Sequence, residues 1–142
     1  MIARPRKVRF VSAGFAVVFV GVFTLVAVLL KNTPTGVFFQ TSDQIAMIGI
    51  GVLLAVGALW FTWPMVSADA SGVLVRNMLA AKFVPWSDVV AITFPDGASY
   101  ARLELPDDEY LVLMAVQSID GDRAVAAIRE LRKLHRAAQS AS

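Results

Sequence analysis

The side chains best suited to chemistry are four carboxylates that lie close together in the sequence. Asp107, Asp108 and Glu109 are consecutive, and Glu104 lies just before them. Carboxylate oxygens are the ligands that hard cations such as Ca²⁺ prefer. Pro106, however, indicates a tight turn between two strands, in which successive side chains diverge into solvent. We therefore interpret this cluster as a solvated hairpin turn and predict no metal site.

The components of nucleophilic catalysis are missing from the sequence. The chain contains one histidine, His135, and no cysteine. No serine has the sequence context of a nucleophile elbow, and no glycine-rich loop could bind phosphate. We therefore predict that the protein is not an enzyme, that it uses no cofactor and that it has no small-molecule substrate.

Trp86 and Asp88 lie where the sequence predicts the entry to a strand. An exposed tryptophan beside a carboxylate could anchor a partner protein. Alternatively, the indole ring closes one end of a curved sheet and Asp88 bonds to the backbone of the turn. We favour this structural interpretation, and we also expect a partly buried ion pair of Arg76 with Asp88 or Asp69.

The predicted C-terminal helix has one apolar and one basic face. The apolar face comprises Ala124, Ala127, Ile128, Leu131, Leu134 and His135. The basic face comprises Arg129, Arg132, Lys133 and Arg136. Near an anionic membrane each basic residue contributes about 1 kcal/mol to binding. We favour a solvated face whose charges suit the helix C-terminus, and we expect Asp120 to be the N-cap residue.

Two apolar runs, residues 10–30 and 45–63, fill most of the first half of the chain. At 1.5 Å per residue they extend about 32 Å and about 28 Å, close to the hydrocarbon thickness of a bilayer. A secretory signal has a shorter apolar core of roughly 7–15 residues, so we predict a retained helix. Neither run contains an ionisable side chain, which argues against an ion pathway through the chain. These residues predict a transmembrane hairpin over residues 10–66.

The distribution of basic residues predicts the orientation of this hairpin. Arg4, Arg6, Lys7 and Arg9 precede the first run, whereas Lys31 is the one basic residue of the connecting loop, residues 31–44. Basic residues favour the cytoplasmic side. We therefore expect a cytoplasmic N-terminus over residues 1–9, an external loop and a cytoplasmic C-terminus at the plasma membrane.

Small residues in the second run indicate where helices approach each other. Gly51 and Ala55 are four positions apart, which is the spacing of close helix packing in membranes. We favour packing within the two-helix hairpin, and the alternative is the seam of a homodimer.

Short β segments follow Pro64. The expected strands are residues 65–69, 73–77, 82–85, 89–94, 99–105 and 110–116. Consecutive short strands favour one curved antiparallel sheet of about six strands, capped by the amphipathic helix. Residues 67–142 are therefore expected to form a cytoplasmic α+β domain of the pleckstrin-homology-like (PH-like) type. After residue 66 the chain has eight basic and ten acidic residues, which gives no support to nucleic-acid binding.

The domain resembles a known family. The matching motifs are DASGV at residues 69–73, Arg76, VPWSDV at residues 84–89 and DGD at residues 120–122. These motifs are similar to the bacterial PH-like domain of small actinobacterial membrane proteins, in which Gly72, Arg76, Pro85 and Asp88 mark fold positions. The resemblance implies a membrane-tethered module without catalytic activity. Eukaryotic PH domains that bind phosphoinositides carry several basic residues in the first hairpin, and here Arg76 stands alone.

The sequence therefore predicts a two-pass plasma-membrane protein whose cytoplasmic PH-like domain is a non-enzymatic interaction or assembly module. Its expected partners are the lipid bilayer and another membrane protein or a second copy of the chain. Two alternatives stay open. The chain is an accessory subunit of a transport or cell-envelope complex, or it senses anionic lipid through the basic helix face.

Overall fold

The computed structural model describes residues 1–34, 36 and 38–141. Residues 35 and 37 of the predicted external loop, and residue 142 at the end of the predicted domain, lie outside the described residues. The chain forms two compact units: a helical unit, Val8–Thr62, and a domain built from Met1–Lys7 together with Trp63–Ser142.

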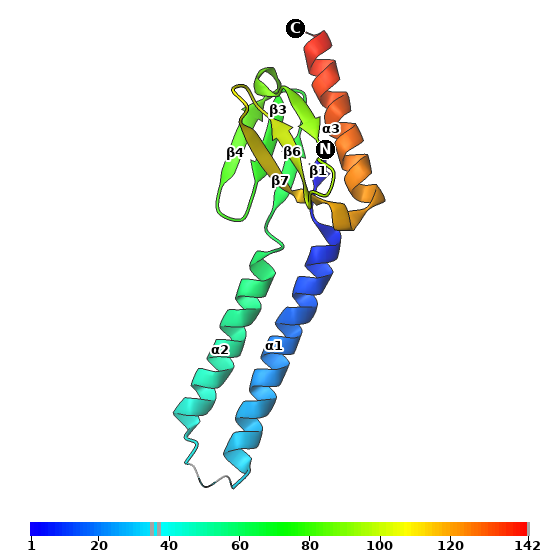
Figure 1. Ribbon diagram of the computed structural model, residues 1–142. Coiled ribbons are helices and arrows are strands. Elements are labelled where there is room, and N and C mark those ends of the chain that lie inside the picture. Colours follow the sequence, from blue (N-terminus) through cyan, green and yellow to red (C-terminus); the bar gives the residue numbers. More distant parts are fainter. Residues whose placement is uncertain (35, 37, 142) are drawn as a thin grey trace. The chain divides into compact units, whose positions relative to one another are not determined.

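Two long helices make up the helical unit: α1 (Arg6–Asn32), whose first two residues belong to the domain, and α2 (Thr41–Trp60) (Figure 1). A reciprocal cap starts α2, because Gln40 and Asp43 each bond the other's backbone N–H through their side chains. Both helices are long and apolar enough to span a membrane, and only 11% of the most apolar stretch of each is buried inside the protein.

The contact between α1 and α2 uses small side chains. Ser12, Ala16 and Ala27 are the buried residues of α1, and Gly51 and Ala55 those of α2. A Cβ atom built on Gly51 would lie 2.7 Å from Cβ of Phe23 and 3.1 Å from the carbonyl oxygen of Phe19. Gly51 therefore packs against α1 of the same chain, as predicted for the hairpin.

We expect Gly51→Val to separate the two helices, because the added side chain would overlap backbone and Cβ atoms of α1. Gly49→Val is the matched control, since a Cβ atom on Gly49 meets nothing within 4 Å. The measurement is disulfide cross-linking of cysteine pairs placed on the facing sides of α1 and α2. Equal cross-linking yields in the two valine variants would contradict this packing.

The domain contains two antiparallel sheets. The first has the strand order β1-β2-β3-β4 and the second the order β5-β6-β7. The strands are β1 (Ile2–Ala3), β2 (Met65–Ala68), β3 (Gly72–Arg76), β4 (Ala81–Pro85), β5 (Ala91–Thr93), β6 (Tyr100–Glu104) and β7 (Tyr110–Gln117). Helix α3 (Asp122–Ser140) follows. Strands β2 to β7 lie within two residues of the predicted segments.

The prediction of one curved sheet was wrong at one place. The strand ladder breaks after Pro85, where Trp86–Asp88 forms a short 3₁₀ turn. Proline has no backbone N–H, and the turn carries the chain from the first sheet to the second. Strand β1, which adds the first residues of the chain to the edge of the first sheet, was not predicted from the sequence.

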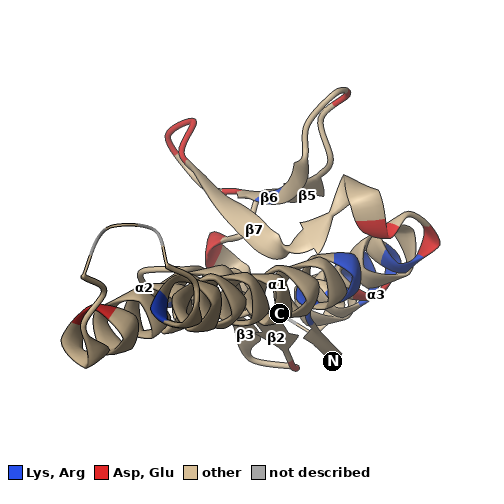
Figure 2. Ribbon diagram, turned by 90° about the horizontal axis from the view of Figure 1, so that it is seen from below, with Lys and Arg blue, Asp and Glu red and all other residues tan. Residues whose placement is uncertain are grey.

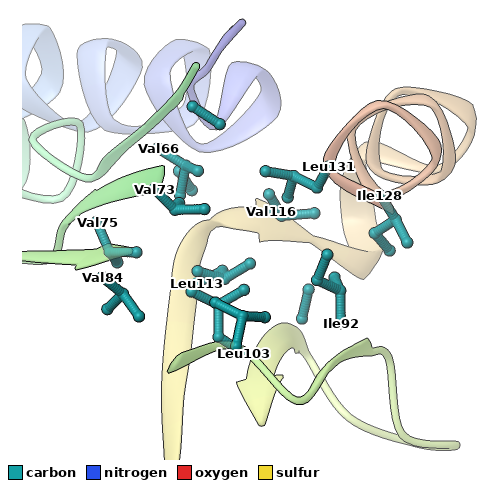
Figure 3. Close-up of a cluster of buried hydrophobic side chains, with 14 of the residues drawn as sticks. Val66, Val73, Val75, Val84, Ile92, Leu103, Leu113, Val116, Ile128 and Leu131 are labelled. Carbon is teal, nitrogen blue, oxygen red and sulfur yellow. The ribbon is translucent and has the colours of Figure 1, made fainter. Parts of the chain in front are cut away.

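The core lies between the two sheets and α3 (Figure 3). Its largest fully buried side chains include Leu103, Leu113, Leu131, Val66, Val73, Val75 and Val116. The predicted apolar face of α3 is confirmed, because Ala124, Ile128, Leu131 and His135 are its buried residues. The helix therefore closes the domain by its apolar stripe.

The turn between β6 and β7 places two acidic residues in left-handed backbone conformations. Asp107 has φ of 61° and Asp108 has φ of 58°, and the N–H of Glu109 donates to the carbonyl of Pro106 at 3.3 Å. Two successive positive φ values are typical of a type I′ turn, which Asn-Gly adopts most easily.

We expect the double substitution Asp107→Asn, Asp108→Gly to raise the free energy of unfolding by about 1 kcal/mol, because glycine removes the left-handed backbone penalty. Thermal unfolding of the full chain in detergent measures the effect. Asp108→Ala removes a charge without relieving the backbone, so it should not stabilise. A stability gain in Asp108→Ala as well would mean that charge repulsion, and not backbone conformation, limits this turn.

Candidate functional site

Trp86 is a core residue of the domain. Its side chain is only 4% exposed, and its indole Nε1 donates to the carbonyl of Asp69 at 2.8 Å. The ring lies 5.6 Å from the ring of His135 on α3. Asp88 accepts a hydrogen bond from the hydroxyl of Ser87 and not from the backbone of the turn. The buried ring agrees with the structural interpretation, and Trp86 offers no surface to a partner.

Arg76 has different partners from those predicted. Its guanidinium lies 4.7 Å from the ring centre of Trp63, and its Nε donates to the carbonyl of Trp63 at 3.3 Å. Asp69 and Asp88 form their hydrogen bonds within their own turns. The expected ion pair is therefore replaced by a cation–π contact at the start of the domain.

Asp69 closes the hairpin between β2 and β3. The Ser71 hydroxyl donates to its Oδ1 at 2.6 Å, and the N–H groups of Ser71 and Gly72 donate at 2.8 and 3.3 Å. These bonds, the hydroxyl bond above all, lower the pKa of Asp69 below its ordinary value. The stabilisation of the hairpin is therefore present above the ordinary carboxyl pKa and is lost as the pH falls through the lowered value.

The basic face of α3 is partly used by the fold. Nε and Nη2 of Arg132 donate to the carbonyl of Ile92 at 3.0 and 2.8 Å, which ties α3 to β5. All four basic residues of this face are exposed. They therefore share a solvent-facing surface, on which the guanidinium of Arg132 also bonds the domain.

The prediction that Asp120 caps α3 was wrong. The residue before α3 is Gly121, which makes no side-chain cap. The Asp120 carboxylate instead accepts the backbone N–H groups of Arg6 at 3.2 Å and Lys7 at 3.0 Å. These are the first residues of α1, so Asp120 caps a helix that begins 114 positions earlier in the chain. Strand β1 lies just before, with Met1 and Ala68 exchanging two backbone bonds of 2.8 and 2.9 Å.

His135 and the carboxylates take structural positions. Nε2 of His135 lies 2.8 Å from the carbonyl of Val89 and 3.2 Å from Nε2 of Gln139. Asp107 and Asp108 lie in the exposed turn described above. Within residues 1–34, 36 and 38–141, no three histidine, cysteine or acidic side chains come together in a way that could hold a metal ion.

A cavity of about 360 Å³ lies between β1, the end of β7 and α3. Its polar and charged lining consists of Arg4, Gln117, Asp120, Arg123 and Glu130. Charges of both signs occur in this lining, and the described lining residues include no nucleophile or metal-ligating histidine. The cavity therefore gives no support to catalysis.

The outer face of the first sheet carries an apolar row that was not predicted from the sequence. The pairing register places Ile2, Ser67, Leu74 and Phe83 side by side on four strands. Ile2, Leu74 and Phe83 are exposed, Phe83 to 51%. The row faces away from the core, because the alternate positions Val66 and Val75 are buried. We name these four residues the sheet row.

Asn77 joins the two sheets. Its side-chain Nδ2 donates to the carbonyl of Val112 at 2.9 Å, and its Oδ1 accepts the N–H of Met114 at 3.3 Å. The amide thus occupies the place of a peptide group beside β7, and it holds the turn between β3 and β4 against the second sheet.

We expect Asn77→Ala to lower the free energy of unfolding by about 2 kcal/mol, because it leaves two backbone groups of β7 without their partner. Chemical denaturation of the full chain in detergent checks this value. Asn77→Asp is the matched variant: it can still accept from Met114, but it places a second acceptor oxygen opposite the Val112 carbonyl, so it should also be less stable than the parent. A loss within error of zero in both variants would show that the bridge does not stabilise the domain.

The arrangement of two antiparallel sheets closed by one C-terminal helix defines a PH-like domain. The family model of the bacterial PH domain matches residues 63–134. Uncharacterised proteins of Mycobacterium tuberculosis and Mycobacterium bovis are each 46% identical over 106 residues, which cover 75% of this chain and 69% of the relative. No solved structure matches the chain. The chain belongs to the bacterial PH domain family, and the predicted actinobacterial resemblance is confirmed.

Proposed function

We propose that this protein is a two-pass protein of the plasma membrane whose cytoplasmic PH-like domain acts as a non-enzymatic interaction or assembly module. The observation that carries the proposal is the uncovered apolar surface of α1 and α2. Only 11% of the most apolar stretch of each helix is buried, whereas the core helix of a water-soluble protein covers its apolar residues. Hydrocarbon is the solvent that such helices require.

The start of the chain supports a retained first helix over a cleaved signal. Met1 and Ala3 pair with β2, and Asp120 binds Arg6 and Lys7. Cleavage after α1 would remove the strand and the capped helix end from the domain. The bias of basic residues toward positions 1–9 favours a cytoplasmic location for both termini.

The topology is tested by cysteine labelling, since the chain has no cysteine of its own. Phe38→Cys, in the loop between the helices, and Ser140→Cys, near the end of α3, are treated in intact cells with a membrane-impermeant maleimide. In intact cells we expect only the Phe38→Cys variant to react, and after lysis we expect both variants to react. Labelling of the Ser140→Cys variant in intact cells would refute the topology, and release of the protein from membranes by alkaline carbonate would refute the anchoring.

The sheet row supports the interaction role, because it leaves exposed apolar side chains on a rigid sheet face. A photo-crosslinking residue at Phe83 in membranes of the source organism tests it, with Asp96 in the turn between β5 and β6 as the control position. We expect a discrete larger adduct from position 83 and none from position 96. No adduct, together with a monomeric protein in several gentle detergents, would count against an assembly module.

One observation favours the second candidate, an accessory subunit of a transport or cell-envelope complex. An apolar cavity of about 540 Å³ lies between the ends of α1 and α2 and is lined by residues that include Val11, Phe15, Phe19, Leu54 and Phe61. An apolar groove of this kind suits the side chains of another membrane helix. Retention of the complex by a chain lacking residues 66–142 would favour this candidate over the domain-based role.

A further inference from the structure

The four strands of the first sheet end in one row. Met65 pairs with Arg76, and Arg76 pairs with Ala81. The pairing of Ala3 with Val66 brings Arg4 beside Met65, where Arg4 Nη2 lies 3.6 Å from Sδ of Met65. We name Arg4, Met65, Arg76 and Ala81 the exit row.

Both chain connections to the helical unit leave the domain at the exit row. Arg4 is followed by buried Pro5 and then by α1, which begins at Arg6. On the other side, α2 ends at Trp60, five residues before Met65. Five residues reach about 17 Å at most. Both connections between the domain and the two apolar helices are therefore short in the chain, and both start from the exit row.

The turn between β3 and β4 extends from the same row. It covers residues 77–80, with the N–H of Asn77 donating to the carbonyl of Ala80 at 2.9 Å. Leu79 at its tip is 94% exposed. The Asn77 side chain anchors the base of the turn to β7, and Leu79 presents an apolar side chain to solvent at its tip.

The two sheets differ in charge, with Asp88 in the turn that joins them. The segment with α3 carries charges of both signs, and its Asp120 bonds the backbone of Arg6 and Lys7. The segments that build the first sheet, residues 1–7 and 63–87, contain five basic residues and one acidic residue, Asp69. Asp69 follows the end of β2 that is opposite to the exit row. Residues 89–117, which build the second sheet, contain five acidic residues and one basic residue. Figure 2 shows acidic residues at both turns of the second sheet.

We infer that the exit row and the β3–β4 turn form a lipid-contact surface that seats the domain on the anionic face of its own membrane. Leu79 enters the boundary of headgroups and acyl chains, and Arg4, Arg76 and Lys82 lie near lipid phosphates. This inference rests on the proposed membrane anchoring. The basic charge of this side and its short covalent connection to the helices identify a lipid surface as the occupant.

The test places a polarity-sensitive fluorophore on Leu79→Cys in the full chain, with Asp108→Cys at the tip of the second sheet as the control. The protein is assembled in nanodiscs of phosphatidylcholine, with or without phosphatidylglycerol, that contain acyl-chain spin-labelled lipid. We expect a blue shift and quenching at position 79 in the discs with phosphatidylglycerol, and neither at position 108.

An unshifted, unquenched probe at position 79 in a protein that has entered the discs would overturn the inference and leave the anchoring intact. Failure to enter the discs would instead refute the anchoring.

A pair of charge-removing variants distinguishes lipid contact by this surface from lipid contact by the basic face of α3. Lys82→Gln removes a charge from this surface, and Lys133→Gln is the matched variant on α3. We expect Lys82→Gln alone to weaken the quenching at position 79 in anionic discs. Weakening by Lys133→Gln alone would assign the lipid contact to α3 and overturn the inference.

Discussion

Trp86→Ala is expected to lower the free energy of unfolding of the domain by about 4 kcal/mol, as is typical of large aromatic side chains removed from a core. The indole ring is buried between the first sheet and His135 of α3, and its N–H satisfies the carbonyl of Asp69. The substitution therefore leaves a cavity and an unpaired acceptor together. Denaturant unfolding of the full chain in detergent, followed by circular dichroism, measures the loss.

Trp86→Phe separates the two contributions. Phenylalanine fills part of the cavity but cannot donate to Asp69, so we expect a smaller loss of about 2 kcal/mol. If Trp86→Ala were as stable as the parent but no longer gave the cross-linked adduct from position 83, Trp86 would act at an interface and not in the core.

Gly72→Ala should destabilise the domain by about 3 kcal/mol, at the upper end of the cost of overpacking. A Cβ atom at this position would lie 2.4 Å from the carbonyl oxygen of Val84 and 2.9 Å from Cα of Pro85. Both are backbone atoms of the neighbouring strand β4, so the clash is relieved only by separating β3 from β4. The same denaturation experiment measures the effect.

Gly97→Ala serves as the comparison. A Cβ atom on Gly97 meets nothing within 4 Å, but its φ of +74° is unfavourable for alanine. We expect a cost of about 1 kcal/mol from backbone conformation alone. If Gly72→Ala costs no more than Gly97→Ala, close strand approach is not the reason for glycine at position 72.

Local patterns were sufficient for most of the secondary structure. The 3.6-residue period predicted the buried face of α3, including Ile128 and Leu131, and the alternation around Leu103 predicted the inner face of β6. Such periods reflect one element lying against a core, whatever that core contains. The resemblance to bacterial PH domains was also predicted, because it depends on local motifs such as VPWSDV at residues 84–89.

Partners far apart in the chain were not predictable in this way. Asp120 was predicted to cap the helix that follows it, but it binds the backbone of Arg6 and Lys7. The basic residues at the start of the chain were interpreted only as a topological signal, and strand β1 before them was not predicted. Asn77 bonds β7 some 35 positions away. The local sequence around an exposed leucine or arginine likewise does not indicate which residues of other strands lie beside it.

The sequence by itself therefore determined the two apolar helices, the order of β2 to β7 and α3 in the domain, and its family. These properties follow from hydrophobic period, turn residues and local motifs, each of which acts over a few positions. Only the tertiary structure decided that the ladder divides after Pro85 into two sheets, that Trp86 is a core residue, and that Arg4, Met65 and Arg76 share one row. Register and long-range pairing arise from packing between segments that the chain brings together only when it folds.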